Sequence, residues 1–186
     1  GVVGYLLKSL FGGCSSALHG GESTVYDHTF TESETKPSLT VEQSVDQICR
    51  RYAGSIVTSL KLACKAGENL VATAKFAAKA QATATKISPT YETIRPLNFA
   101  DMLTASGFKI GSTYYSEVET LELTFKNNGE MVYTMGSNDP AFFCVKASEV
   151  SGKFELYMDA TSAAKYADYI SKTEQALELL WKGDSI

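Results

Sequence analysis

The chain has 186 residues, of which 44% are hydrophobic and 20% are charged, so it is long enough to bury the core of one domain. A net charge of −4 argues against the basic surface that nucleic-acid binding requires, and the apolar content argues against disorder. Residues 1–13 are too short to span a membrane and lack the basic region and cleavage site of a signal peptide.

The first quarter of the chain predicts a helix followed by two strands. Apolar residues at helical spacing over 4–11, stopped by a pair of glycines, predict a short helix. The small, glycine-rich segment 14–23 predicts a loop. Alternating polarity predicts strands over residues 24–31 and 38–45.

The clearest strand pattern lies in residues 55–65 and 69–79, which a turn at 65–69 joins into a hairpin. The first strand is expected to bury Ile56, Leu60, Leu62 and Cys64. The second is expected to bury Leu70, Ala72, Ala74, Phe76 and Ala78. Such alternation is typical of antiparallel sheets that bury one face, and residues 81–87 extend this unit. The Ala- and Thr-rich stretch 72–85 suits either a close subunit interface or a locally thin core.

Between residues 88 and 116 the pattern is weak, because prolines and glycines interrupt it. Short strands are expected only near 99–104 and 108–110. A long, weakly patterned segment inside a domain usually carries an interaction. We therefore interpret this segment as a crossing loop or an arm that reaches an adjacent subunit.

Regular patterns resume at residue 116. The strand 116–126 is followed by Asn127-Asn128-Gly129 and the strand 130–135, which predicts a hairpin. Further strands are predicted over residues 142–147, 152–159 and 174–181. A helix is predicted over 161–171, capped by Asp159 or Thr161, with an apolar stripe of Ala163, Tyr166, Ala167 and Ile170. Together these elements predict a mainly β fold, an antiparallel β-sandwich or half-barrel with one or two short flanking α-helices.

The sequence predicts no catalytic, cofactor-binding or metal-binding residues. The four cysteines are far apart, and Cys64 and Cys144 are interpreted as reduced core residues. His28 is interpreted as structural and His19 as exposed. Five acids could supply a catalytic carboxylate pair: Glu117, Glu119, Glu122, Glu155 and Asp159. Glu122 and Glu155 are expected on the solvent-facing sides of strands, so we interpret these acids as surface charge.

A stripe of lysines is expected on the outer face of the 55–79 hairpin, formed by Lys61, Lys65, Lys75 and Lys79. Because Ser, Thr and Ala rather than aromatic residues lie between them, we interpret the stripe as protection against edge pairing rather than as a nucleic-acid site.

The order of these elements resembles the major tail tube protein family of long-tailed bacteriophages. The matching pieces cover nearly the whole chain, and their order and spacing carry the resemblance. They are GYLLKSLFGG (4–13), TVYDHTFTESETKPSLTVEQ (24–43), YAGSIVTSLKLACKAGENLVATAKFAAK (52–79), RPLNFADM (95–102), YSEVETLELTFKNN (115–128) and SGKFELYMD (151–159).

The resemblance implies a structural subunit of a siphovirus-type tail rather than an enzyme. It implies that copies assemble into stacked hexameric rings whose lumen conducts DNA during ejection, without specific DNA binding and without a membrane. The implied partners are other copies, the tape-measure protein, and the tail terminator and tip proteins. The protein is expected in the virion tail, assembled in the bacterial host cytoplasm, with no cofactor. The loops at 12–23 or 136–141 are expected to make contacts between rings.

Residues 1–186 are expected to form a single tail-tube-like domain that lacks both ends of the full protein, since the sequence begins at Gly1 and ends on an unfinished strand pattern. Two alternatives remain open at this point. One is the inner-tube protein of a contractile tail or secretion machine. The other is a carbohydrate-binding β-sandwich that would use Tyr114, Tyr115 and Trp181 as aromatic platforms.

Overall fold

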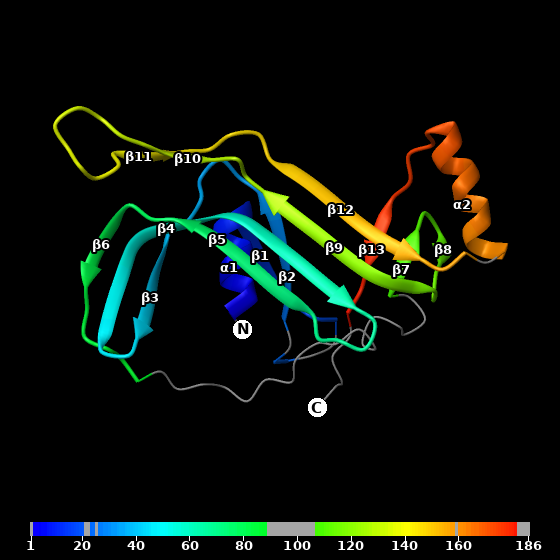
Figure 1. Cartoon of the computed structure of the whole chain (residues 1–186), viewed down its shortest axis with the longest axis horizontal. Coiled ribbons are helices and arrows are strands. Elements are labelled where there is room, and N and C mark those ends of the chain that lie inside the picture. Colours follow the sequence, from blue (N-terminus) through cyan, green and yellow to red (C-terminus); the bar gives the residue numbers. More distant parts are fainter. Residues whose placement is uncertain (1, 21–22, 25, 89–106, 159, 182–186) are drawn as a thin grey trace. The chain divides into compact units, whose positions relative to one another are not determined.

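The computed structural model describes residues 2–20, 23–24, 26–88, 107–158 and 160–181. These residues form antiparallel sheets and two short helices, which confirms the predicted mainly β fold class (Figure 1). The helices are α1 (Val2–Phe11) and α2 (Ala160–Ser171). The strands are β1 (Gly12–Leu18), β2 (Tyr26–Glu32), β3 (Leu39–Val45), β4 (Ile48–Lys65), β5 (Val71–Ala77), β6 (Ala80–Thr83), β7 (Phe108–Ile110), β8 (Thr113–Tyr114), β9 (Val118–Lys126), β10 (Glu130–Val132), β11 (Phe142–Cys144), β12 (Glu149–Leu156) and β13 (Leu177–Leu179).

The chain forms two compact units, each assembled from three stretches of sequence. The first unit comprises Gly1–Leu60, Thr73–Thr90 and Thr124–Val150, and the second comprises Lys61–Ala72, Tyr91–Leu123 and Ser151–Ile186. The sheets of the described residues are β1–β2, β10–β11, β13–β7–β8 and a larger one with the order β12–β9–β4–β3, in which β5 and β6 also pair with β4.

In the first unit, α1 lies against a ribbon formed by β1 and β2 (Figure 1). The two strands pair antiparallel from Gly12↔Glu32 to Leu18↔Tyr26. The loop predicted over 14–23 is therefore wrong for the residues that belong to β1. Small residues have low strand propensity, but pairing with the aromatic and β-branched residues of β2 overrides this local preference.

The C-terminus of α1 is capped by a buried lysine from the segment between β2 and β3. The Lys36 ammonium donates a 2.9 Å hydrogen bond to the Phe11 carbonyl, which also accepts one of 2.8 Å from the Ser33 amide. A cation at this position compensates the negative end of the helix dipole. Burial lowers the pKa of Lys36 from its usual 10.5, and Glu32, whose carboxylate lies 3.9 Å away, opposes that shift.

We expect the free energy of unfolding of the wild type to rise at alkaline pH, and we expect this rise to be absent from the Lys36→Met variant. Because the folded chain has the lower Lys36 pKa, the unfolded chain holds this proton up to higher pH. The free energy of unfolding should thus rise as the pH passes through the folded pKa towards 10.5, by at most about 1.4 kcal/mol per pH unit. Urea titrations of both proteins over this range measure the effect. A difference between them that is independent of pH would contradict the lowered pKa.

The sequence predicted that this strand starts at residue 55, but β4 already starts at Ile48. Gly54 has a φ of 62°, and a Cβ at this position would lie 2.8 Å from the Lys79 Cβ. Beside this glycine the pairing with β3 shifts register, between Leu39 and Val41. The predicted break is therefore a β-bulge within one continuous strand.

The middle of β4 is buried on both faces rather than on one. Ile56 and Leu60 are buried as predicted, but Ser55 and Val57, which alternate with them, are buried as well. The Val57 amide donates a 3.2 Å hydrogen bond to the hydroxyl of Ser9 on α1. This hydrogen bond ties the middle of β4 to the N-terminal helix.

Strand β5 does not bury the face predicted for it. Phe76 keeps 40% of its accessible surface, and Ala72 is exposed. The prediction is wrong for these two side chains because alternation places them on one face of β5, and the described residues do not bury that face. β5 is consequently a surface strand of the described chain.

The hairpin predicted from 116–126 to 130–135 is wrong. In the sheets, β9 lies between β4 and β12, whereas β10 pairs with β11. A two-residue type I′ turn requires positive φ at both central residues. Asn128 has a φ of 48°, but Gly129 does not have a positive φ. Gly129 is needed for another reason, since a Cβ there would collide with the ring of Phe143.

Asn127 explains why the chain leaves β9 at this point. Its side-chain amide donates a 2.7 Å hydrogen bond to the Val57 carbonyl, and its Oδ1 accepts one of 3.0 Å from the Gly129 amide. Its backbone amide donates to the Thr58 carbonyl at 3.1 Å. The side chain is buried, so these bonds hold the segment along β4 instead of allowing it to fold back on β9.

The core of the second unit is built around Phe108 and Tyr115, each of which keeps 1% of its accessible surface. Their rings pack edge to face with centroids 6.5 Å apart, and Phe154 packs on Phe108 at 5.3 Å. The buried cluster is completed by Cys64, Val118 and Leu121. This unit therefore has an aromatic core of its own.

The arm expected over 88–116 is wrong for residues 107–116. These residues form β7 and β8, and β7 also pairs with β13, so they belong to the core of the second unit. The two-residue strand β8 is too short to show alternation in sequence. Residues 89–106, which include the strand expected at 99–104, lie outside the described residues.

The helix predicted over 161–171 is confirmed as α2, but the side chains of its apolar stripe are exposed. Those described as exposed are Ala163, Tyr166, Ala167 and Ile170. The predicted caps, Asp159 and the side chain of Thr161, lie outside the described residues. The remaining predicted strands are present, most of them shorter than expected.

Candidate functional site

The β1–β2 ribbon brings together a serine and a histidine that are distant in sequence. Ser16 pairs with His28, and the Ser16 hydroxyl lies 2.7 Å from His28 Nδ1. A nucleophilic triad also needs an acid that orients the histidine. The nearby carboxylate of Asp27 instead contacts His19 at 3.0 Å. Both pairs are exposed, so the described ribbon has no catalytic triad, and His28 stays interpreted as structural. Sequence reasoning missed the pair because it predicted a loop at Ser16.

Two of the acids considered for paired-acid chemistry, Glu122 and Glu155, form ion pairs with lysines. Glu122 contacts Lys61 at 2.6 Å, and Glu155 contacts Lys153 at 2.7 Å. Hydrogen bonds from Lys153 and then Thr120, together with the charge of Lys153, lower the pKa of Glu155. A general acid at neutral pH needs the opposite shift. The pairs also neutralise Lys61, a member of the predicted lysine stripe.

The thiols are all free. Cys49 and Cys64 are buried, Cys144 is half-buried and Cys14 is exposed. Among the described residues, no group of three or more His, Cys, Asp or Glu side chains is placed to hold a metal ion. In the same part of the chain, no helix has the length and apolar character needed to cross a bilayer.

None of the three rings expected to serve as carbohydrate platforms is exposed, and Tyr114 is half-buried. Tyr115 is buried in the core of the second unit, and Trp181 packs partly buried against the same core. A sugar-binding surface depends on exposed rings, so the structure counts against that alternative.

Strand edges are the most prominent exposed feature of the chain. β12 lies at one end of the order of the largest sheet and is exposed at every position except its last. The β1–β2 and β10–β11 ribbons each consist of two strands, so each presents two outer edges within the described residues. Such edges are templates for pairing with another chain.

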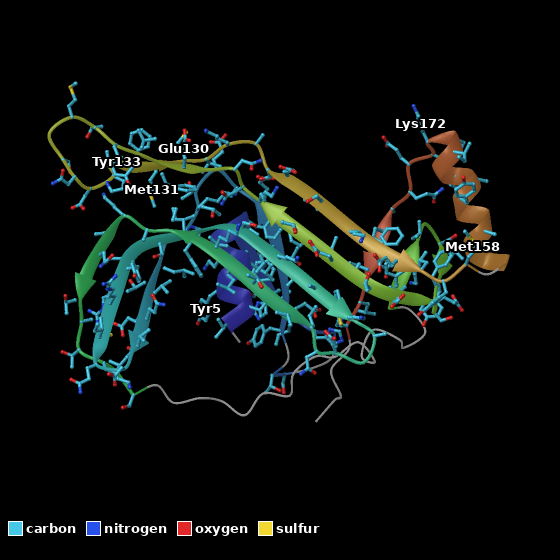
Figure 2. The ribbon with its side chains drawn as sticks, in the orientation of Figure 1. Tyr5, Glu130, Met131, Tyr133, Met158 and Lys172 are labelled. Carbon is cyan, nitrogen blue, oxygen red and sulfur yellow. The ribbon has the colours of Figure 1, made fainter. Side chains whose placement is uncertain are left out.

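A second exposed feature is the tip between β10 and β11, residues 133–141, which we call the β10–β11 loop. Met135 is fully exposed, and Phe142, the first residue after the loop, is exposed as well. Tyr133, which is labelled in Figure 2, is also exposed. The Ala141 amide donates a 2.8 Å hydrogen bond to the Val132 carbonyl, which closes the loop. The structure thus presents a closed loop that exposes the apolar side chains of Tyr133 and Met135 beside the polar Ser137, Asn138 and Asp139.

A third feature is a hollow of about 490 Å³ between α1 and the β1–β2 ribbon, which we call the α1 groove. Its lining is mostly apolar and includes the Tyr5 side chain labelled in Figure 2. The lining residues are Val3, Gly4, Tyr5, Leu7, Lys8, Cys14, Ser16, His28 and Phe30. Sequence reasoning could not find this hollow, because three elements build it and one of them was predicted to be a loop.

The antiparallel sheets and the unpaired strand edges of the described residues suit a protein that associates with other chains. The sequence pattern of the phage tail tube protein family matches residues 1–186, and the chain belongs to this family. No curated protein matches the chain. Its place is the tail of the virion, its role is structural rather than enzymatic, and membership of this family implies self-assembly.

Proposed function

We propose that the chain is the tube subunit of a non-contractile, siphovirus-type tail, in which six copies close into rings that stack around a channel for DNA. The observation that supports this proposal best is the open edge of β12, together with membership of the tail tube family. Closure into a ring pairs each edge with that of a neighbour and so removes exposed edges from the assembly.

The channel carries DNA without gripping it. Tight DNA binding requires cations that replace the counterions of the phosphates. A subunit with a net charge of −4 gives every ring an acidic balance, which keeps phosphates from adhering during ejection. The partners of the tube are further copies, the tape-measure protein, and the terminator and tip proteins. The assignment of residues 1–186 to a single tail-tube-like domain also belongs to this proposal.

Negative-stain imaging of the purified protein tests the proposal. We expect rings or tubes with an axial pore, whereas a strict monomer at high concentration would count against the tube. Images of intact tails separate the two tube classes, because a sheath around the tube would assign it to a contractile machine.

The edge itself can be tested at Val150 of β12, which is 63% exposed. Val150→Lys should suppress ring formation, since a lysine on an edge strand opposes pairing. Val150→Thr is the matched control and should assemble like the wild type. Normal rings from Val150→Lys would show that this edge is not the one that pairs.

A further inference from the structure

We propose that the β10–β11 loop of one copy inserts the exposed Met135 side chain into the α1 groove of a second copy in the next ring. This contact would join successive rings, and it rests on the proposed function. The segments 136–141 and 12–23 were predicted as alternatives for contacts between rings, and this proposal uses both, as a projection and a receptor.

The projection carries two exposed apolar side chains on a pre-shaped loop. Met135 lies fully in solvent, and Tyr133 keeps 63% of its surface. Gly136 has a φ of 91°, and the Ser137 hydroxyl accepts a 3.0 Å hydrogen bond from the Asp139 amide. A loop that is already ordered loses less conformational entropy when it binds.

The receptor is an apolar hollow with room for the tip. Val3 and Tyr5 of α1 line it from one side and Phe30 of β2 from the other, and both α1 side chains are exposed. No residue of the β10–β11 loop is among those that line the groove, so a copy does not fill its own groove in this structure. Burying the Met135 side chain there would remove apolar surface of both partners from water.

The charges of the two surfaces are complementary. Asp139 on the loop and Lys8 in the groove are exposed, and neither forms an ion pair within the described residues. Glu130 at the base of the loop is already paired with Lys146 at 2.8 Å. The α1 groove is lined by Lys8 and by no Asp or Glu, whereas the three other hollows are lined by glutamates as well as lysines.

The contact has the symmetry that stacking requires. The tip and the groove are different surfaces of the first unit, so the contact is heterologous. A heterologous contact repeats without closing unless its rotation completes a ring. Ring closure uses the strand edges, which leaves this contact free to repeat along the tube axis.

Cys14, an exposed thiol in the groove, allows a direct test by cross-linking. In assembled Met135→Cys protein, oxidation with copper phenanthroline should link the new thiol of one copy to Cys14 of the next. A disulfide forms only when the two Cβ atoms lie about 3.5–4.5 Å apart, so the link reports close approach. We expect a ladder of dimers and higher oligomers on non-reducing gels. Wild type and Met135→Cys/Cys14→Ser are the controls and should show none.

Each outcome of this experiment is decisive. A ladder that needs both thiols supports the contact. Tubes on the grid without a ladder overturn the contact but leave the proposed function intact. Dimers that persist in Met135→Cys/Cys14→Ser show tip-to-tip contact and also overturn it. Absence of rings and tubes from wild-type protein overturns the proposed function, and this contact with it.

Variants of the two surfaces provide an independent measurement. Met135→Asp should raise the protein concentration needed for tubes roughly tenfold to a hundredfold while rings still form. Lys8→Glu and Asp139→Lys should each raise the concentration needed for tubes about two- to fivefold. The double variant should form tubes at the wild-type concentration again. A double variant that is no better than either single change would contradict the pairing of these two charges.

Discussion

Replacement of Phe108 with alanine is expected to lower the free energy of unfolding by about 3–5 kcal/mol, the largest loss that we predict for a single substitution. Phe108 is buried, and its ring packs edge to face on Tyr115 and Phe154. Truncation would leave a cavity that a core of close-packed rings cannot readily fill. Urea unfolding monitored by tryptophan fluorescence measures the loss, since Trp181 packs against the same core.

Phe142→Ala is the matched control for this experiment, because Phe142 is 56% exposed and its removal leaves no buried cavity. Its free energy of unfolding should stay within about 0.5 kcal/mol of the wild type. The experiment also separates the two interpretations of residues 107–116. If residues 107–116 were an arm between subunits, the Phe108→Ala protein would assemble poorly but its monomer would be as stable as the wild type. That result would contradict the aromatic core described above.

Asn127→Ala is expected to cost about 2–3 kcal/mol of unfolding free energy. The substitution removes the donor to the Val57 carbonyl and the acceptor for the Gly129 amide, and it leaves both groups without these bonds. Because the site is buried, water cannot readily replace the lost partners. Chemical denaturation of the purified variant measures the change.

Two further substitutions sharpen this prediction. Asn127→Asp keeps an acceptor for Gly129 but loses the donor and buries a charge, so it should cost more than alanine does. Asn138→Ala changes an exposed asparagine of the β10–β11 loop and should be nearly neutral. An Asn127→Ala protein as stable as Asn138→Ala would show that the hydrogen bonds of Asn127 do not hold the end of β9.

The sequence allowed the fold class and most strands to be predicted because these depend on local alternation. The run 55–65 shows the antiparallel pattern without reference to any other segment, and the helix at 4–11 ends at its glycines as expected. The family could likewise be predicted, since the order of such elements is a property of the sequence itself.

The errors arose where distant residues determine the local structure. The Asn-Gly pair at 128–129 is a strong hairpin signal, but Val57 and Thr58, some 70 positions earlier in the chain, bind Asn127 and redirect the backbone. The small residues of β1 form a strand only because β2 pairs with them. In both cases tertiary contacts overrode a correct reading of local preference.

The candidate site could be predicted only as loops. Residues 12–23 or 136–141 were expected to contact other rings, and the structure adds the exposed Met135 next to the second segment and a hollow beside the first. The hollow was not predictable, because it depends on how α1 lies on the ribbon, and the pairing of Ser16 with His28 depends on strand register.

The division of each unit into three separated stretches of chain has a practical consequence for mapping its functions. Because of this division, cutting the polypeptide at one position cannot separate the two units intact. Truncated fragments are therefore expected to misfold because their cores are incomplete, whatever role the deleted part had. Assignments of function within this protein must therefore come from point substitutions and thiol labelling in the intact chain.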